Sequence, residues 1–321
     1  MRRKIIVLRG GPSSEYEVSM KTGRAVIDEL SKKHEILDVV IDKQGKWISR
    51  GREVRPEIIC QNCDLVFNAL HGEFGEDGQV QKILETTGVC FTGPQKLAAA
   101  LSMNKAQTKD IYKKFGIKTP YYKVVNREDG DIDKLATDIF RTFPMPVIIK
   151  PVNLGSSVGI SIARDYKSLK ETLTSLFIRY DKLLVEEYIK GKEATVAVVE
   201  SFRNKDFYSL FPVEIRIPSS SEFFDYNAKY SGETQEICPG NFSAKESEIM
   251  QDLAIKAHQA LGLRHYSRTD FIISPTRGVY VIETNSLPGL TNESLLPKSL
   301  LAIGSNYGEF LQHIVELAID K

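Results

Sequence analysis

The stretch YVIETNSLPGLTNESLLP, residues 280–297, places two oxygen-bearing side chains, Glu283 and Asn285, at the end of a short apolar run. The run VYVIETN is rich in β-branched and aromatic residues, which predicts a strand. Side chains two residues apart on a strand point to the same side, so these two present their oxygens together. A second apolar run begins just after Asp270, and pairing through the turn at 274–278 brings Asp270 close to both.

Three hard oxygen donors in one place suit Mg²⁺, which is bound through a few carboxylates and keeps positions for phosphate oxygens. Each of these side chains, taken singly, is equally compatible with a solvated turn at a strand end. Arg268 lies two residues before Asp270, on the same side of the predicted strand. It is either a functional cation or a structural partner of that carboxylate.

A second chemistry-bearing stretch is KPVNLGSSVGIS, residues 150–161, between two strand-like runs. Its small residues give a turn with exposed backbone N–H groups and hydroxyls, which can wrap polyphosphate oxygens or simply close a hairpin. The pattern is not a Walker loop, and residues 10–12 do not match a dinucleotide fingerprint, which disfavours a nicotinamide oxidoreductase. HGEFGEDGQVQ, residues 71–81, is either part of a site or an ordinary acidic loop capped by Asp77.

Composition limits the classes of function. The chain has 321 residues, enough for two or three domains, with 42% hydrophobic and 26% charged residues. A net charge of +1 gives no indication of a nucleic-acid or membrane-surface partner. No apolar run approaches the ~18 residues of a membrane span, and no signal peptide is recognised, so we expect a cytoplasmic protein. A single CxxC at Cys60 and Cys63 does not favour a zinc site.

The elements that must position these residues fall into three sections. Alternating strand and helix signals over residues 1–93 predict a parallel α/β layer, whose ligands bind beyond the carboxyl ends of the strands. In residues 94–185, a helix pair ending at Gly116 precedes four strand-like runs, YYKVV, PVIIKPV, GISIA and LLVEEYI. Residues 186–321 contain the predicted metal cluster. They also contain a polar stretch without periodicity, 218–240, of a length typical of loops that cover a site.

Eight motifs occur together along the chain. In order they are GGPSSEYEVS (10–19), LHGEFGEDGQVQ (70–81), TGPQKLAAALSMNKAQTK (92–109), PVIIKPVNLGSSVG (146–159), VEEYIKGKE (185–193), FFDYNAKY (223–230), RTDF (268–271) and ETNSLPGLTNESLLPK (283–298). With these motifs the chain resembles the D-alanine–D-alanine ligases of the ATP-grasp superfamily nearly end to end. The resemblance implies an α/β fold of the α+β ATP-grasp type, with an N-terminal parallel α/β domain followed by two ATP-grasp subdomains.

The resemblance also implies a reaction. ATP phosphorylates the carboxylate of a first D-alanine, and the amine of a second attacks the acyl phosphate, giving D-alanyl-D-alanine for peptidoglycan precursors. The implied small-molecule partners are ATP and D-alanine, with two Mg²⁺ ions, for which Mn²⁺ can substitute, and a homodimeric assembly. The implied metal ligands are Asp270, Glu283 and Asn285.

For the nucleotide, the resemblance implies lysines at the phosphates and a loop folded over them, with Glu186 and Ile189 at adenine and Glu193 at ribose. The implied ATP-binding residues are Lys105, Lys150, Gly155, Ser156, Ser157, Glu186, Ile189, Glu193 and Lys229. From the residues alone, Glu186 is either a nucleoside contact or a solvated acid at a strand end.

For the amino acids, Glu15 corresponds to the group that holds the first ammonium, and Arg268 and the Gly289 N–H correspond to stabilisers of the oxyanion. Ser156 and Tyr230 correspond to a latch on the long loop. The implied catalytic residues are Glu15, Ser156, Tyr230, Arg268 and Gly289. The implied substrate-binding residues are Glu15, His71, Glu76, Gly289, Ser294 and Leu295, with Lys229 also at the second carboxylate.

Three residues depart from the family pattern: Asn104 replaces a usual Asp, Ser267 a frequent Gly, and Glu293 stands where His or a neutral residue is common. A carboxylate beside the second-substrate pocket leaves D-serine or D-lactate as alternative second substrates, although Tyr230 favours the dipeptide. We expect Glu293 to point to solvent, because burying an unpaired carboxylate is costly. A non-catalytic ATP-binding protein is a further alternative, disfavoured by the presence of Arg268 beside the metal cluster.

Overall fold

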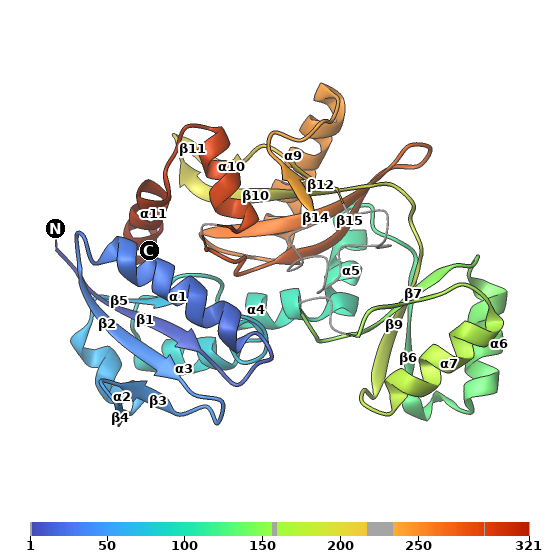
Figure 1. Ribbon diagram of the computed structural model, residues 1–321, viewed down its shortest axis with the longest axis horizontal. Helices are drawn as coiled ribbons and strands as arrows, with labels where there is room; N and C mark the ends of the chain where they lie inside the picture. The colour runs from blue at the N-terminus through green and yellow to red at the C-terminus, as the bar shows by residue number, and fades with distance from the viewer. Residues whose placement is uncertain (1, 156–158, 217–233, 292, 321) are drawn as a thin grey trace.

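The structure is a computed structural model that describes residues 2–155, 159–216, 234–291 and 293–320. Within these ranges the chain forms three β-sheets with flanking helices (Figure 1). The N-terminal sheet lies at one end of the molecule, the central sheet at the other, and the C-terminal sheet lies above the helices that connect them. No described helix is long and apolar enough to cross a membrane.

The N-terminal sheet has the strand order β4-β3-β2-β1-β5. Its strands are β1 (Lys4–Gly10), β2 (Glu35–Ile41), β3 (Trp47–Ser49), β4 (Arg52–Glu53) and β5 (Leu65–Asn68). Its helices are α1 (Tyr16–Leu30), α2 (Pro56–Ile59), the 3₁₀ helix η1 (Cys60–Asn62) and α3 (Gln79–Thr87). β1 is parallel to both β2 and β5, which confirms the predicted parallel layer. The β3–β4 hairpin at its edge is antiparallel and was not predicted.

The ends of α3 show how local sequence positions the loop before it. Gly88 adopts φ 71° at the C-cap, a left-handed conformation that glycine adopts without strain. At the other end the N-cap is Gly78 rather than Asp77. Asp77 still accepts hydrogen bonds from the backbone N–H groups of Phe74 (2.9 Å) and Gln79 (3.0 Å), so it stabilises the turn that enters the helix.

The central sheet has the order β6-β9-β7-β8, with antiparallel pairing throughout. Its strands are β6 (Tyr122–Asn126), β7 (Val147–Pro151), β8 (Ser161–Ala163) and β9 (Lys182–Glu187). The elements that cover it are the 3₁₀ helix η2 (Arg127–Asp129), α6 (Ile132–Thr142) and α7 (Tyr166–Phe177). The four strands predicted from sequence are confirmed. Their apolar side chains form one core with α6 and α7.

The C-terminal sheet has the order β13-β12-β10-β14-β15, with β11 paired to β10. Its strands are β10 (Lys192–Phe202), β11 (Lys205–Ser209), β12 (Val213–Arg216), β13 (Gln235–Ile237), β14 (Tyr266–Ser274) and β15 (Gly278–Asn285). Its helices are α9 (Ala244–Ala260), α10 (Leu295–Ala302) and α11 (Tyr307–Ile319). The predicted hairpin of β14 and β15 is confirmed. The prediction of a continuous loop over 218–240 is wrong at β13, which pairs with β12.

Two helices, α4 (Lys96–Met103) and α5 (Lys105–Lys114), connect the N-terminal sheet to the central one. Figure 1 shows α5 between the central and C-terminal sheets. Tyr112 of α5 is fully buried in the core of the C-terminal sheet, and its hydroxyl lies 2.7 Å from Thr284 Oγ1 on β15. We propose that residues 1–93, 94–185 and 186–321 are three domains, each built around one sheet, with α5 at the junction and with β9 ending two residues past the second boundary, at Glu187.

Candidate active site

The β14–β15 hairpin assembles the predicted metal cluster. Its register places Asp270 opposite Glu283 and Arg268 opposite Asn285, so all four side chains lie on one face. Arg268 Nε and its second terminal nitrogen donate to the two carboxylate oxygens of Asp270 at 3.0 and 3.1 Å. The Asn285 amide donates to Asp270 at 2.9 Å. Burial disfavours the guanidinium charge, but Asp270 outweighs burial, and the pKa of Arg268 is raised.

The donor set fits a divalent cation, with one condition. Asp270 also accepts from the Thr195 hydroxyl at 2.6 Å, so each of its oxygens accepts two hydrogen bonds and one must be exchanged for a cation. Asn285 uses its amide nitrogen towards Asp270, which leaves its carbonyl oxygen as a ligand. In the part of the chain that the structure describes, there is no cluster of three or more His, Cys, Asp or Glu suited to a metal. The predicted set differs in having an amide as its third donor.

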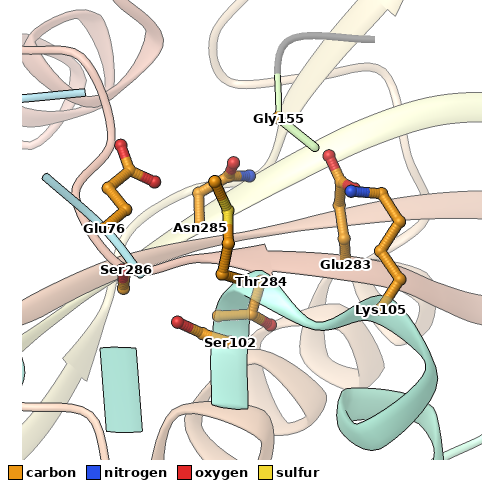
Figure 2. A pocket seen from close by; sticks show the side chains of 9 residues that line it. Glu76, Ser102, Lys105, Gly155, Glu283, Thr284, Asn285 and Ser286 are labelled. Atoms are coloured by element: carbon orange, nitrogen blue, oxygen red, sulfur yellow. The ribbon is translucent and has the colours of Figure 1, made fainter. Parts of the chain in front are cut away.

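A pocket runs along this face of β15. Figure 2 shows Glu283 and Lys105 together at one end, Glu76 at the other and Asn285 between them. The residues that line it are Glu76, Ser102, Met103, Lys105, Gly155, Glu283, Thr284, Asn285 and Ser286. Lys105 Nζ lies 3.8 Å from a Glu283 oxygen and donates to the Leu154 carbonyl, so the lysine joins β15 to the loop after β7.

A second charged cluster lies where α5 meets the central sheet. Glu186 on β9 is 3% exposed, which excludes the alternative of a solvated acid at a strand end. Its two oxygens lie 2.7 Å from Lys109 Nζ and 2.7 Å from Lys150 Nζ. Burial opposes ionisation of Glu186, but the two ammonium groups outweigh it, and its pKa is lowered. Burial lowers the pKa of Lys109 to about 8.

Lys109 was not among the residues predicted from the sequence, where its spacing from Lys105 is the one available signal. Lys109 follows Lys105 by four residues in MNKAQTK, so both lie on one side of α5. A helix lysine is ordinarily exposed, and only the fold shows that this one is buried. The remaining predicted nucleotide residues flank the β9–β10 connection: Ile189 is buried, and Glu193 is partly buried on β10.

The predicted group for the first substrate lies where the N-terminal sheet faces Gly155. The backbone gives this proximity, because a Cβ at Gly72 would lie 2.7 Å from Glu15 Oε2 and one at Gly155 would lie 3.1 Å from it. His71 is buried, with its ring nitrogens 2.9 Å from Thr22 Oγ1 and 3.3 Å from Glu76 Oε1. Burial raises the pKa of Glu76. An ordinary solvated loop is therefore excluded for His71.

The segment after β15 carries the remaining predicted residues. A Cβ at Gly289 would lie 2.9 Å from Ser294 Oγ, so a larger residue does not fit there without a shift. Ser294 Oγ also accepts from the Thr291 backbone N–H at 3.1 Å. Ser294 is the N-cap of α10, and Leu295 is its buried first residue. This helix N-terminus presents backbone N–H groups next to Gly289.

The three departures from the family pattern have structural explanations. Asn104 is the N-cap of α5 and accepts from the Gln107 N–H at 3.0 Å, a role that Asn and Asp share. Ser267 is fully buried, and its hydroxyl lies 2.8 Å from His258 Nδ1 on the opposite side of β14 from Arg268. Glu293 is exposed, as predicted.

The predicted residues Ser156, Ser157, Lys229 and Tyr230 lie outside the described residues. The others fall into three groups: the β14–β15 cluster, the lysine–glutamate cluster at α5, and the Glu15–His71–Glu76 group. The pocket joins the first and third through Glu283, Asn285 and Glu76. Their assignment to particular ligands stays a prediction.

Comparison with known proteins finds similar sequences over nearly the whole chain. The family model described as D-ala D-ala ligase C-terminus matches residues 111–316, and that described as D-ala D-ala ligase N-terminus matches residues 4–59 and 50–94. A D-alanine–D-alanine ligase of Citrifermentans bemidjiense is 38% identical over 320 residues, covering 99% of this chain and 96% of the relative. One of Moorella thermoacetica is 36% identical over 322 residues, covering 99% of each.

Solved structures are similar over the same length. The VanG D-Ala:D-Ser ligase from Enterococcus faecalis has a TM-score of 0.84 at 27% identity, with 99% of this chain and 100% of that chain covered. The D-alanyl-alanine synthetase A of Vibrio cholerae has a TM-score of 0.85 at 26% identity, with 99% of each chain covered. The predicted ATP-grasp architecture is therefore confirmed.

Proposed function

Because this chain belongs to the D-alanine–D-alanine ligase family, we propose that its pocket joins two D-alanine molecules with cleavage of ATP to ADP and phosphate. The reaction supplies D-alanyl-D-alanine for peptidoglycan precursors. One observation carries the proposal at the level of geometry. The hairpin gathers Arg268, Asp270, Glu283 and Asn285 on one face, and two of these, Glu283 and Asn285, line a pocket together with Lys105 and Glu76.

The chemistry explains why charge is gathered in this way. A carboxylate is a poor electrophile, so one D-alanine carboxylate first takes the γ-phosphoryl group, and the amine of the second then displaces phosphate. Phosphoryl transfer depends on positioning and on neutralising charge more than on covalent chemistry from the protein. Lys105 and Lys150 provide fixed cations for the phosphates, while Glu186, Ile189 and Glu193 provide the adenine and ribose contacts.

The cation that accompanies ATP fits Asp270, Glu283 and Asn285. We assign these oxygens to Mg²⁺, two ions in all, with Mn²⁺ able to substitute. When bound there, the cation neutralises the phosphate oxygens. For Asp270 to bind the cation, one of its four hydrogen bonds must be released. Arg268 is the donor whose release also frees a positive charge for the reacting carboxyl group.

The ammonium group of the first D-alanine and the carboxylate of the second are held by different groups of the protein, each suited to the opposite charge. Glu15, beside Gly72 and Gly155, holds the ammonium of the first D-alanine, with the His71–Glu76 pair behind it. Arg268 and the Gly289 N–H stabilise the oxyanion of the tetrahedral intermediate. The carboxylate of the second D-alanine is held at Ser294 and Leu295, since the N-terminus of α10 favours an anion.

D-Serine is the second candidate for the second substrate, because a D-Ala:D-Ser ligase is among the structural neighbours. The exposed position of Glu293 removes the reason to expect an altered carboxylate pocket. Phosphate release with ATP and D-alanine, alone or together with D-serine or D-lactate, tests this. The product that dominates when D-alanine competes with D-serine or with D-lactate identifies the second substrate. A cytoplasmic location, expected from the sequence, and a homodimer, expected from the resemblance, belong to the same proposal.

A further inference from the structure

Lys109 and Lys150 enclose one carboxylate in the interior of the protein. Their ammonium nitrogens each lie 2.7 Å from an oxygen of Glu186. The side chain of Lys109 is 1% exposed, and those of Lys150 and Glu186 are each 4% exposed. Two ammonium groups and one carboxylate leave a net charge of +1 in this buried trio, defined as Lys109, Lys150 and Glu186. Burying a net charge is costly, so an anion bound beside the trio would be favoured, although Glu283 also attracts Lys109.

Lys109 is held in place from several sides. Its Nζ donates to Thr119 Oγ1 at 2.5 Å and lies 5.6 Å from the centre of the Tyr122 ring on β6. One helical turn away on α5, Lys105 reaches Glu283, and Tyr112 is fixed against β15. Lys109 therefore acts through Glu186, because it contacts the carboxylate oxygen that Lys150 does not. It is a positioning residue rather than a catalytic one.

The effect of Lys109 follows from charge balance. Lys150 and Glu186 alone form a neutral ion pair, in which the carboxylate already satisfies the ammonium group. With Lys109 on the other carboxylate oxygen, Glu186 is shared between two cations, and part of the Lys150 charge is left for another anion. Burial is the main cause of the lowered pKa of Lys109, and repulsion from Lys150 adds to it.

We infer that Lys109 determines nucleotide affinity through the phosphates, by neutralising Glu186 so that Lys150 remains available to a phosphate oxygen. The inference rests on the proposed nucleotide site at Lys150 and Glu186. It distinguishes Lys109 from a residue that only shapes the adenine pocket. Lys109 should affect ligands with phosphates and leave the bare nucleoside nearly unaffected.

The test is the dissociation constant of adenosine divided by that of ATP, both measured by titration calorimetry with Mg²⁺ present throughout. Weaker binding of ATP alone lowers this ratio. Lys109→Met reduces the trio charge from +1 to 0, Glu186→Gln raises it to +2, and the double variant returns it to +1. Lys114→Met is the matched control, because Lys114 is an exposed lysine on the same helix. Lys109→Gln repeats the charge loss with a polar side chain, in case the methionine variant does not fold.

We expect Lys109→Met to lower the ratio about tenfold, which is about 1.4 kcal/mol, with adenosine affinity nearly unchanged. The double variant should regain the wild-type ratio, Glu186→Gln should exceed it, and Lys114→Met should match it. An unchanged ratio in both Lys109 variants, or a double variant no better than Lys109→Met, would overturn the inference. Failure of the wild-type chain to bind ATP would overturn the proposed nucleotide site itself, and the inference with it.

Discussion

Replacing Arg268 with methionine separates its catalytic role from its structural one. The guanidinium makes two hydrogen bonds to Asp270, at 3.0 and 3.1 Å, and its side chain is 15% exposed. Asp270 loses its cationic partner in the variant but keeps hydrogen bonds from Thr195 and Asn285, so both of its oxygens still have a donor. The stability loss should therefore be about 1.5–3 kcal/mol, the value for a hydrogen bond to a charged group. Loss of an oxyanion stabiliser should lower kcat by about 10²–10³-fold, which corresponds to ~2.7–4 kcal/mol.

The assay is ADP release coupled to pyruvate kinase and lactate dehydrogenase, with urea unfolding measured on the same preparations. Arg264→Met is the matched control: this partly buried arginine donates to the Gly93 carbonyl at 3.1 and 2.9 Å and to the Phe91 carbonyl, and neither residue belongs to the proposed site. It should lose stability and keep kcat. A kcat for Arg268→Met within about tenfold of wild type, or an equal fall in Arg264→Met, would refute the oxyanion assignment.

Three further predictions follow. Glu283→Gln should abolish turnover and remove the Mn²⁺-dependent relaxation enhancement of water protons, while the circular dichroism spectrum stays native; retained enhancement would contradict the metal assignment. Glu293→Gln should change KM for the second D-alanine less than about twofold, because the side chain is exposed; a tenfold fall would show that it faces the pocket. Burial lowers the pKa of Lys109 from 10.5 to about 8, so between these pH values the unfolded state binds more protons and stability rises with pH through this group. Urea unfolding across that window should show a gain for wild type relative to Lys109→Met, and parallel curves would contradict the shift.

The β14–β15 cluster could be predicted because its information is local. Two apolar runs joined by a short turn define a hairpin, and the alternation of side chains then fixes which residues share a face. Asp270 and Glu283 accordingly lie opposite one another in the structure. The α3 C-cap was predictable for a similar reason, because a left-handed residue at a helix end favours glycine.

What could not be predicted depends on contacts between distant segments. Lys109 is buried because β7 and β9 bring Lys150 and Glu186 to the same side of α5, and nothing near it in sequence shows this. β13 is three residues long and depends on pairing with β12 across more than 15 intervening residues, so its own sequence looked like a loop. The role of Ser267 also needed the fold, since its partner His258 lies on α9.

The most direct test of the central claim follows an oxygen atom. If the carboxylate of the first D-alanine attacks the γ-phosphate, one of its oxygens leaves with the phosphate when the amine displaces it. D-Alanine labelled with ¹⁸O in the carboxylate should therefore transfer one labelled oxygen to inorganic phosphate for each D-alanyl-D-alanine formed, as measured by mass spectrometry. Unlabelled phosphate accompanying dipeptide formation would contradict the acyl phosphate route, and release of phosphate without dipeptide would contradict ligation itself.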